Sequence, residues 1–164
     1  MQTMHRFGVD SLRAGGFHGF IPFSALRTGG LLDVPDVPGV YVVVRASSGP
    51  ILFLEDSRGG WFKGKDPTVP VGVLEARWID DAEELYIGKA DRLRRRVKEL
   101  SEFGHGRPVG HRGGRFLWQI EGSADLLVGW LATPGRDPRQ VEVQMLAAFR
   151  EEFGGRQPFA NIAG

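Results

Sequence analysis

The sequence of 164 residues contains no cysteine. This absence excludes disulfide bonds, cysteine nucleophiles and zinc sites built on thiolates, and it is compatible with a reducing cytoplasm. Histidine is scarce, with four in the chain at positions 5, 18, 105 and 111. None of them has the paired spacing by which a helix presents two imidazoles to one metal ion, so they remain candidate ligands without a motif.

Long apolar runs are missing as well. The longest apolar stretch near the N-terminus is interrupted by His18, Pro22 and Ser24, so the sequence predicts neither a signal peptide nor a membrane span. Its apolar and charged fractions, 41% and 25%, are typical of a globular protein. A chain of this length can bury one core. We therefore expect a single soluble domain over residues 1–164, located in the cytoplasm and without a membrane partner.

The net charge is only +1, but the basic residues are concentrated in one segment. Between Tyr86 and Arg115 there are nine lysines and arginines against three acidic residues, a local charge of +6 that leaves −5 for the rest of the chain. Such a segment favours an anion-facing surface, for which phosphate is the usual partner. A solvated helix face is an equally common origin of the same pattern.

Within this segment, an apolar strand at Leu85–Ile87 is followed by a turn at Gly88 and then by a helix. Leu93, Val97, Leu100 and Phe103 share one helical stripe, which predicts the buried face. Arg96 lies inside that stripe. Because a guanidinium is rarely buried alone, Arg96 either has an acidic partner or opens into a cleft that binds an anion.

The N-terminal half predicts strands around a long excursion. Residues 1–37 form an extension that covers an edge of the core, and Gly39–Val44 is a buried, β-branched strand. Two further strand-like pieces, Ile51–Leu54 and Val71–Ile79, lie on either side of a stretch rich in glycine and lysine. That stretch could form a ribbon with a flexible tip.

The excursion interleaves aromatic and basic residues at Trp61, Phe62, Lys63 and Lys65. Proteins that bind single-stranded nucleic acids use this composition. A ribbon whose aromatic rings pack on the body of the protein would have the same composition, and the sequence alone favours that simpler interpretation.

After the basic helix, a loop over residues 104–115 combines glycines with imidazoles and guanidiniums. Glycine lets the backbone approach a phosphate closely, and the cations would neutralise it. There is no Walker motif and no Gly-x-Gly-x-x-Gly after a strand, so no nucleotide cofactor site is predicted. The candidate substrate-binding residues on the helix and the loop are Arg92, Arg95, His105, His111, Arg112 and Arg115.

The last predicted helix begins with Asp137 as its cap and Pro138 at its first position. Glu142 lies near the centre of its apolar face and is thus a second charge on a buried side. Arg96 and Glu142 could form a buried ion pair, or they could line one cleft. In a cleft, a carboxylate that holds a metal, an arginine and the tyrosines Tyr41 and Tyr86 are suited to phosphodiester hydrolysis.

Five elements in order resemble the motifs of the GIY-YIG nuclease superfamily: Gly39–Tyr41, Tyr86–Lys89, Arg96, Glu142 and Pro158–Asn161. That superfamily includes homing endonucleases, the N-terminal nuclease domain of the bacterial excision-repair incision protein and some restriction enzymes. Each tripeptide alone is weak, but their order and the spacing between Gly88 and Arg96 are specific. The resemblance covers residues 39–161.

The resemblance implies an α/β (α+β) fold with a small central three-stranded antiparallel sheet flanked by helices. It implies a divalent-metal-dependent DNA endonuclease in which a tyrosine assists the attacking water. Glu142 would be the sole protein ligand of Mg²⁺ or Mn²⁺, with waters completing the coordination. Tyr41 and Tyr86 would lie near the scissile phosphate, one of them as general base or to orient the water, and Arg96 would hold that phosphate.

Three other motif residues take supporting roles in this comparison. Lys89 would assist Arg96, Gly88 would allow close approach of the backbone, and Asn161 would brace the site from the C-terminal side. The sequence departs from the family in the length between the first two motifs, so residues 46–82 resemble an insertion, expected to be β-rich and to read the substrate. Specificity could also come from a second copy of the chain or from a partner protein.

A second departure concerns the proton relay. Family members often carry a histidine or tyrosine four residues after the motif arginine, and this sequence has Leu100 there. His105 or His111 could substitute from the following loop. If neither does, the alternative is a catalytically inactive module that keeps the fold and binds nucleic acid.

Overall fold

The structure, a computed structural model, describes residues 7–162. Its centre is an antiparallel sheet of four strands in the order β1-β4-β2-β3. The strands are β1 (His18–Pro22), β2 (Gly39–Val44), β3 (Glu84–Ala90) and β4 (Leu127–Ala132). The α-helices are α1 (Val9–Ala14), α2 (Phe23–Arg27), α3 (Val71–Arg77), α4 (Leu93–Gly104) and α5 (Pro138–Glu152). Three 3₁₀ segments complete the fold: η1 (Gly30–Asp33), η2 (Arg112–Gln119) and η3 (Ser123–Asp125).

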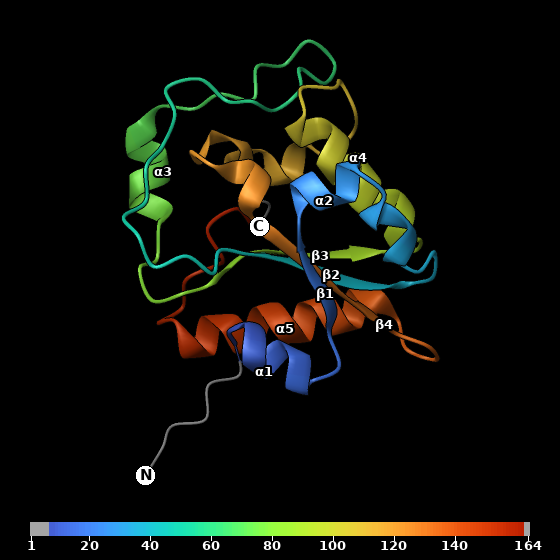
Figure 1. Cartoon of the computed structure of the whole chain (residues 1–164). Coiled ribbons are helices and arrows are strands. Elements are labelled where there is room, and N and C mark those ends of the chain that lie inside the picture. The colour runs from blue at the N-terminus through green and yellow to red at the C-terminus, as the bar shows by residue number, and fades with distance from the viewer. Residues whose placement is uncertain (1–6, 163–164) are drawn as a thin grey trace.

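The helices form layers on both faces of the sheet, as Figure 1 shows: α1 and α5 cover one face, and α2, α4 and η2 lie over the other. The central strand β2 serves both layers because its side chains alternate. Val40 and Val42 join the apolar cluster on the α5 side, whereas Tyr41 and Val43 join the cluster on the α4 side. This alternation directs Tyr41 toward α4.

The predicted mixed α/β fold is confirmed, but the sheet has four strands where three were predicted. The additional strand β1 lies in the N-terminal extension. Its register with β4 shifts between Gly19 and Ile21, and Phe20 between them has a positive φ of 58°. This bulge interrupts the alternation of apolar and polar residues by which a strand is recognised.

The prediction of a β-rich insertion at residues 46–82 was wrong. The stretch predicted as a strand at Val71–Ile79 contains the helix α3, which begins directly after Pro70. The only strand-like pairings of the insertion are isolated bridges, Phe53 with Ile120 and Phe62 with Lys65. A short apolar run does not distinguish a strand from a helix, and α3 buries only Leu74.

The two long helices follow the predicted patterns. In α4, Leu93, Val97, Leu100 and Phe103 are fully buried, as their stripe predicted. In α5, the Asp137 side chain accepts a hydrogen bond from the backbone N–H of Arg139 at 2.9 Å, and Pro138 follows as predicted. None of the helices formed by residues 7–162 has the length and apolar character needed to cross a membrane.

Candidate active site

Strands β2 and β3 bring the two tyrosines together. Tyr41 pairs with Gly88 and Val43 with Tyr86, so both phenol rings lie on the α4 side, with centroids 6.0 Å apart. A Cβ atom at Gly88 would lie 2.4 Å from Cζ of Tyr41. Gly88 is therefore not the predicted turn: it lies inside β3, and its missing side chain makes the space for the Tyr41 ring.

His111 completes a group of three rings with the tyrosines. Its Nε2 shares a hydrogen bond of 2.8 Å with the Tyr41 hydroxyl, and its ring centroid is 5.7 Å from that of Tyr86. The imidazole is fully buried, and within the described part of the chain its Nδ1 has no hydrogen-bond partner. Burial, assisted by the charge of Arg96, lowers the pKa of His111 to about 3, so the ring is neutral at physiological pH.

Of the two histidines considered as replacements at the Leu100 position, His111 is the one that reaches a tyrosine. A Cβ atom at Gly114 would meet His111 at 3.3 Å and Leu100 at 3.4 Å, so the imidazole enters the site from the loop just beyond the buried leucine. His105 is exposed and lies elsewhere, in a cavity of about 340 Å³ that it shares with Arg27 and Lys98.

Arg96 lies at the opening of the site. Its Nη1 donates to Oε2 of Glu99 and to the backbone carbonyl of Gly110, both at 2.7 Å, and a third of the side chain is exposed. Burial raises the pKa of both phenols, and the positive charge of Arg96 acts against that rise. The predicted alternative, an ion pair with Glu142, is absent among residues 7–162, where Glu99 is the carboxylate partner of Arg96.

Glu142 approaches the same edge from the other face of the sheet. It is half-buried on α5 beside Lys89, and its negative charge contributes to the raised pKa of Tyr86. Burial raises the pKa of the Glu142 carboxyl itself, and the ammonium of the exposed Lys89 opposes this rise.

The surroundings of Glu142 suit a divalent cation. No side-chain nitrogen of a lysine, arginine or histidine in residues 7–162 forms an ion pair with its carboxylate, which is partly withdrawn from water and interacts with the Lys89 backbone. A carboxylate without an ion-pair partner is a suitable single ligand for Mg²⁺, which keeps several waters. In the same described range, no three histidine, aspartate or glutamate side chains gather into a metal-binding group.

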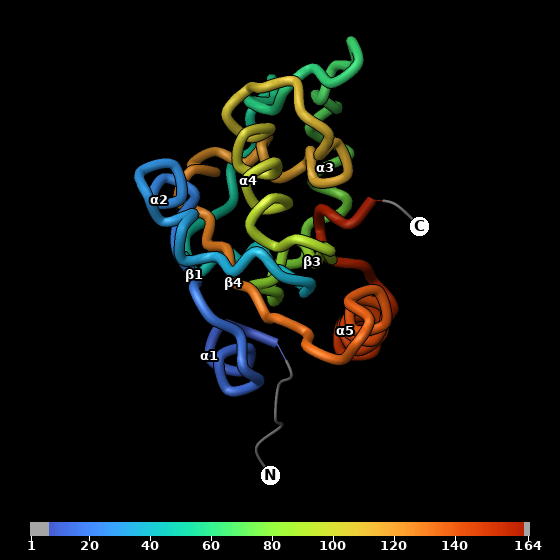
Figure 2. Tube along the Cα trace, turned by 90° about the vertical axis from the view of Figure 1, so that its right-hand side faces the viewer, coloured from blue at the N-terminus to red at the C-terminus, as the bar shows by residue number. Residues whose placement is uncertain are grey.

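Asn161 fixes the outer edge of β3. Its Oδ1 accepts from the backbone N–H of Ile87 and its Nδ2 donates to the Ile87 carbonyl, both at 2.9 Å. The backbone N–H of Ala160 donates to the Leu85 carbonyl at 2.8 Å. Figure 2 looks along α5 and shows this C-terminal segment turning back from the helix toward β3.

Sequence reasoning missed Arg77, which holds that segment in place. Its Nε donates to the Phe159 carbonyl at 3.0 Å and its Nη2 to the Asn161 carbonyl at 2.7 Å. Arg77 is the last residue of α3, in the stretch predicted as a strand. No pattern in the neighbouring sequence predicts its hydrogen bond to Asn161, 84 residues away.

The four arginines predicted to bind substrate divide into two pairs. Arg92, at the N-cap of α4, and Arg95, on the helix, are both exposed. They form ion pairs with Asp36 and Glu99, respectively, and line a cavity of about 190 Å³ with Arg96. The other two stabilise loops: Arg112 donates to the carbonyls of Lys65 and Asp66, and Arg115 donates to the Arg112 carbonyl.

The site therefore joins residues from β2, β3, α4, α5 and the segments that follow α4 and α5. Comparisons of this chain with protein-family models, curated proteins and solved structures gave no match.

Proposed function

We propose that this protein is a divalent-metal-dependent DNA endonuclease of the GIY-YIG type, which hydrolyses phosphodiester bonds in the cytoplasm. One observation supports the proposal above all others. The residues singled out by the ordered motifs gather around β3 although they come from distant parts of the sequence: Tyr41 and Tyr86 pack together, Arg96 and Glu142 act through their charges on the Tyr86 phenol, and Asn161 binds the Ile87 backbone. A chance resemblance of tripeptides gives no reason for them to converge.

The two tyrosines would have different roles. Tyr41 is 1% exposed and is engaged by His111, whereas Tyr86 is half-buried in front of it. Burial keeps both phenols protonated at neutral pH, because it raises their pKa above the ordinary value of 10.0. Tyr86 is thus the residue that would orient the attacking water, and Tyr41 with His111 would position the Tyr86 ring.

Arg96 would bind the phosphate. Its Nη1 donates to Glu99 and Gly110, and the other nitrogens of the partly exposed guanidinium could donate hydrogen bonds to a phosphate. Glu142 would hold Mg²⁺ or Mn²⁺ with waters in the other positions. Such an ion supplies electrostatic stabilisation of the phosphate and lowers the pKa of a bound water. Lys89 adds a positive charge beside Glu142, and Asn161 keeps β3 in register with the site.

The decisive experiment is cleavage of supercoiled plasmid by purified protein in Mg²⁺, in Mn²⁺ and in EDTA. Glu142→Gln preserves the shape of the side chain and removes the anionic ligand, so we expect a loss of cleavage of about 100-fold or more. Glu75→Gln, at an exposed position of α3, makes the same chemical change away from the site and should cleave like the wild type. Cleavage in EDTA, or full activity of Glu142→Gln, would refute the mechanism.

A catalytically inactive DNA-binding module remains the alternative, favoured by Leu100 at the usual histidine or tyrosine position. The hydrogen bond between His111 and Tyr41 weakens that argument, because an imidazole reaches the tyrosine by another route. If the module is inactive, no metal should produce cleavage, while duplex binding should still fall steeply with salt. A salt slope near zero would exclude phosphate contacts and with them both interpretations.

A further inference from the structure

Trp61 is a large aromatic residue that does not pack into the core of the protein. Of the four tryptophans, Trp118 and Trp130 are buried and Trp78 packs against Phe159, whereas Trp61 is 58% exposed. In residues 7–162 it joins neither apolar cluster and makes no ring–ring or cation–π contact. An exposed indole offers the combination of an apolar ring and a polar N–H for which tryptophan is enriched at interfaces.

The backbone on both sides of Trp61 is fixed. The N–H of Gly60 donates to the Phe103 carbonyl at 2.9 Å, and a Cβ at Gly60 would lie 1.8 Å from the Arg107 carbonyl oxygen. On the other side, Phe62 pairs with Lys65 across a two-residue turn in which Lys63 and Gly64 both have positive φ, 54° and 72°. Such a tight hairpin turn holds Trp61 on a defined surface rather than on a flexible tip.

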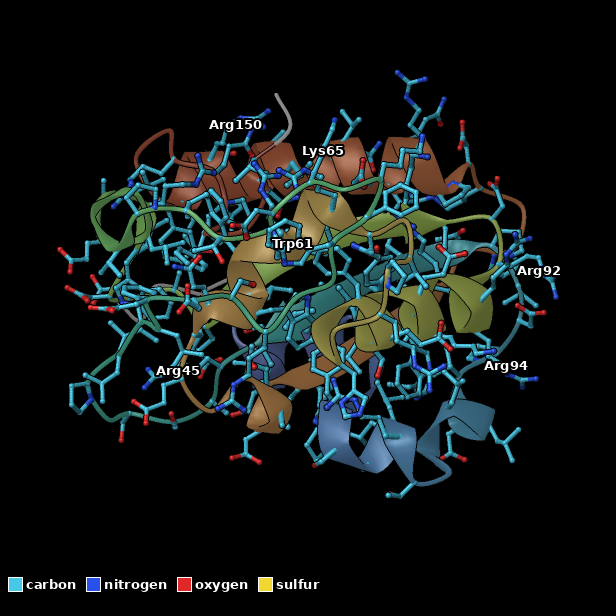
Figure 3. The ribbon with its side chains drawn as sticks, turned by 90° about the horizontal axis from the view of Figure 1, so that it is seen from above. Arg45, Trp61, Lys65, Arg92, Arg94 and Arg150 are labelled. Atoms are coloured by element: carbon cyan, nitrogen blue, oxygen red, sulfur yellow. The ribbon has the colours of Figure 1, made fainter. Side chains whose placement is uncertain are left out.

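The charged residues next to Trp61 along the chain are basic. Arg58, Lys63 and Lys65 are exposed, whereas the exposed acidic residues Glu55, Asp56 and Asp66 lie at the two ends of this stretch. Arg112 lies against the same loop, where its guanidinium binds the Lys65 carbonyl. Figure 3 shows Trp61 and Lys65 close together in the view from above, whereas Arg92 lies at the edge of the molecule. An exposed indole among cations is complementary to a nucleotide, whose base stacks while its phosphates are neutralised.

The residue that follows Trp61 contacts a loop of the candidate active site. Phe62 packs on Gly110, where an added Cβ would lie 3.5 Å from the Phe62 ring. The carbonyl of Gly110 accepts the 2.7 Å hydrogen bond from Arg96. One packing contact therefore separates the residue next to Trp61 from the loop that positions the phosphate-binding arginine.

We infer that Trp61 is a stacking platform for an unpaired base of the DNA, with Lys63 and Lys65 contacting the flanking phosphates. In an intact duplex each base face is already covered by its neighbours, so the indole requires a single-stranded, frayed or extruded nucleotide. The preferred substrate then carries an unpaired stretch beside the scissile phosphate. The reference to a scissile phosphate rests on the proposed function, whereas binding of the unpaired strand does not.

The test is binding in EDTA, where cleavage does not interfere, of fluorescein-labelled oligothymidine and of a labelled duplex, measured by fluorescence anisotropy. A base–aromatic stack is worth about 1–3 kcal/mol, so Trp61→Ala should weaken single-strand binding by roughly 5- to 140-fold. Duplex binding should change by less than about 2-fold, since no base face is available there. Trp61→Phe should keep most of the affinity. The matched control is Leu52→Ala, because Leu52 is equally exposed at 58% and lies in the same insertion; it should bind like the wild type.

Intrinsic fluorescence gives a second readout that a structural role would not move. Oligothymidine should quench the tryptophan emission of the wild type, and Trp61→Phe should bind with that quenching lost. Unchanged single-strand binding by Trp61→Ala, or an equal loss on the duplex, would overturn the inference. Tighter binding of oligouridine than of oligothymidine would overturn the assignment to DNA.

These outcomes are independent of the cleavage assay. If no metal supports cleavage but oligothymidine binding depends on Trp61, the endonuclease proposal fails and the stacking platform stands. If Mg²⁺-dependent cleavage is found while Trp61→Ala binds single strands normally, the platform fails and the endonuclease stands.

Discussion

Replacing His111 by phenylalanine should destabilise the protein at pH 8 and stabilise it at pH 4. At pH 8 the substitution removes the 2.8 Å hydrogen bond to Tyr41 inside a fully buried site. Phenylalanine is similar in size to histidine, so the main effect is the loss of that hydrogen bond, which leaves the Tyr41 hydroxyl without its imidazole partner. Wild-type protein should therefore be more stable by about 1–3 kcal/mol.

Acid reverses this advantage because the buried imidazole is neutral. The pKa of His111 is about 3 in the folded protein, against 6.5 for an ordinary histidine. Between these two values the unfolded chain binds a proton at His111 and the folded chain does not. A depressed folded pKa means that the stability is complete above pH 6.5 and is lost as the pH falls from 6.5 toward 3. At about 1.4 kcal/mol per pH unit, the loss reaches roughly 3–4 kcal/mol at pH 4. His111→Phe has no such loss and should be the more stable protein at pH 4.

The measurement is urea unfolding at a series of pH values from 8 to 4, with the free energy of unfolding compared between the two proteins. Glu84 is also buried, and its pKa, raised by burial to about 7, makes the wild type titrate in the same range. That contribution cancels in the difference because both proteins contain Glu84. His105→Phe, at an exposed histidine, should leave the pH profile unchanged. A difference between wild type and His111→Phe that stays constant from pH 8 to pH 4 would refute a buried neutral imidazole.

Two further substitutions test the architecture of the site. Asn161→Ala removes both hydrogen bonds to the Ile87 backbone and should cost about 1–3 kcal/mol in urea unfolding, with faster amide exchange at Ile87; unchanged exchange there would contradict the clamp. Gly88→Ala puts a methyl group 2.4 Å from Cζ of Tyr41 and should destabilise the protein by about 1–3 kcal/mol. Gly72→Ala, in a helix with no atom near the new methyl, should be neutral or stabilising, and equal melting temperatures for these two alanine variants would show that Tyr41 does not need the space.

The sequence predicted the features that depend on neighbouring residues along the chain. The stripe that begins at Leu93 and the cap at Asp137 depend on residues within one or two helical turns, so the sequence predicts them directly. The inward position of Arg96 was visible for the same reason. The carboxylate partner of Arg96 could not be predicted. Glu99, three residues later on the same helix, forms the 2.7 Å ion pair, and the sequence does not show which of several carboxylates a guanidinium will contact.

Long-range pairings were beyond such signals. The bulge at Phe20 concealed β1, and α3 satisfied the same apolar pattern as a strand. His111 was predicted both as a phosphate-binding residue and, together with His105, as a possible replacement at the Leu100 position, but its burial behind Tyr41 was not predicted. Its burial depends on how residues 104–114 fold against α4, and this is not encoded in the neighbours of His111 along the chain.

The clamp of Asn161 on β3 has a consequence for the newly made protein. At a synthesis rate of about 5–20 residues per second, the 75 positions that separate Tyr86 from Asn161 take roughly 4–15 s to be added. During that interval the Ile87 backbone groups are open to water or to a strand of another chain. The edge of β3 therefore stays uncovered until the C-terminal segment has been synthesised and has folded back onto it.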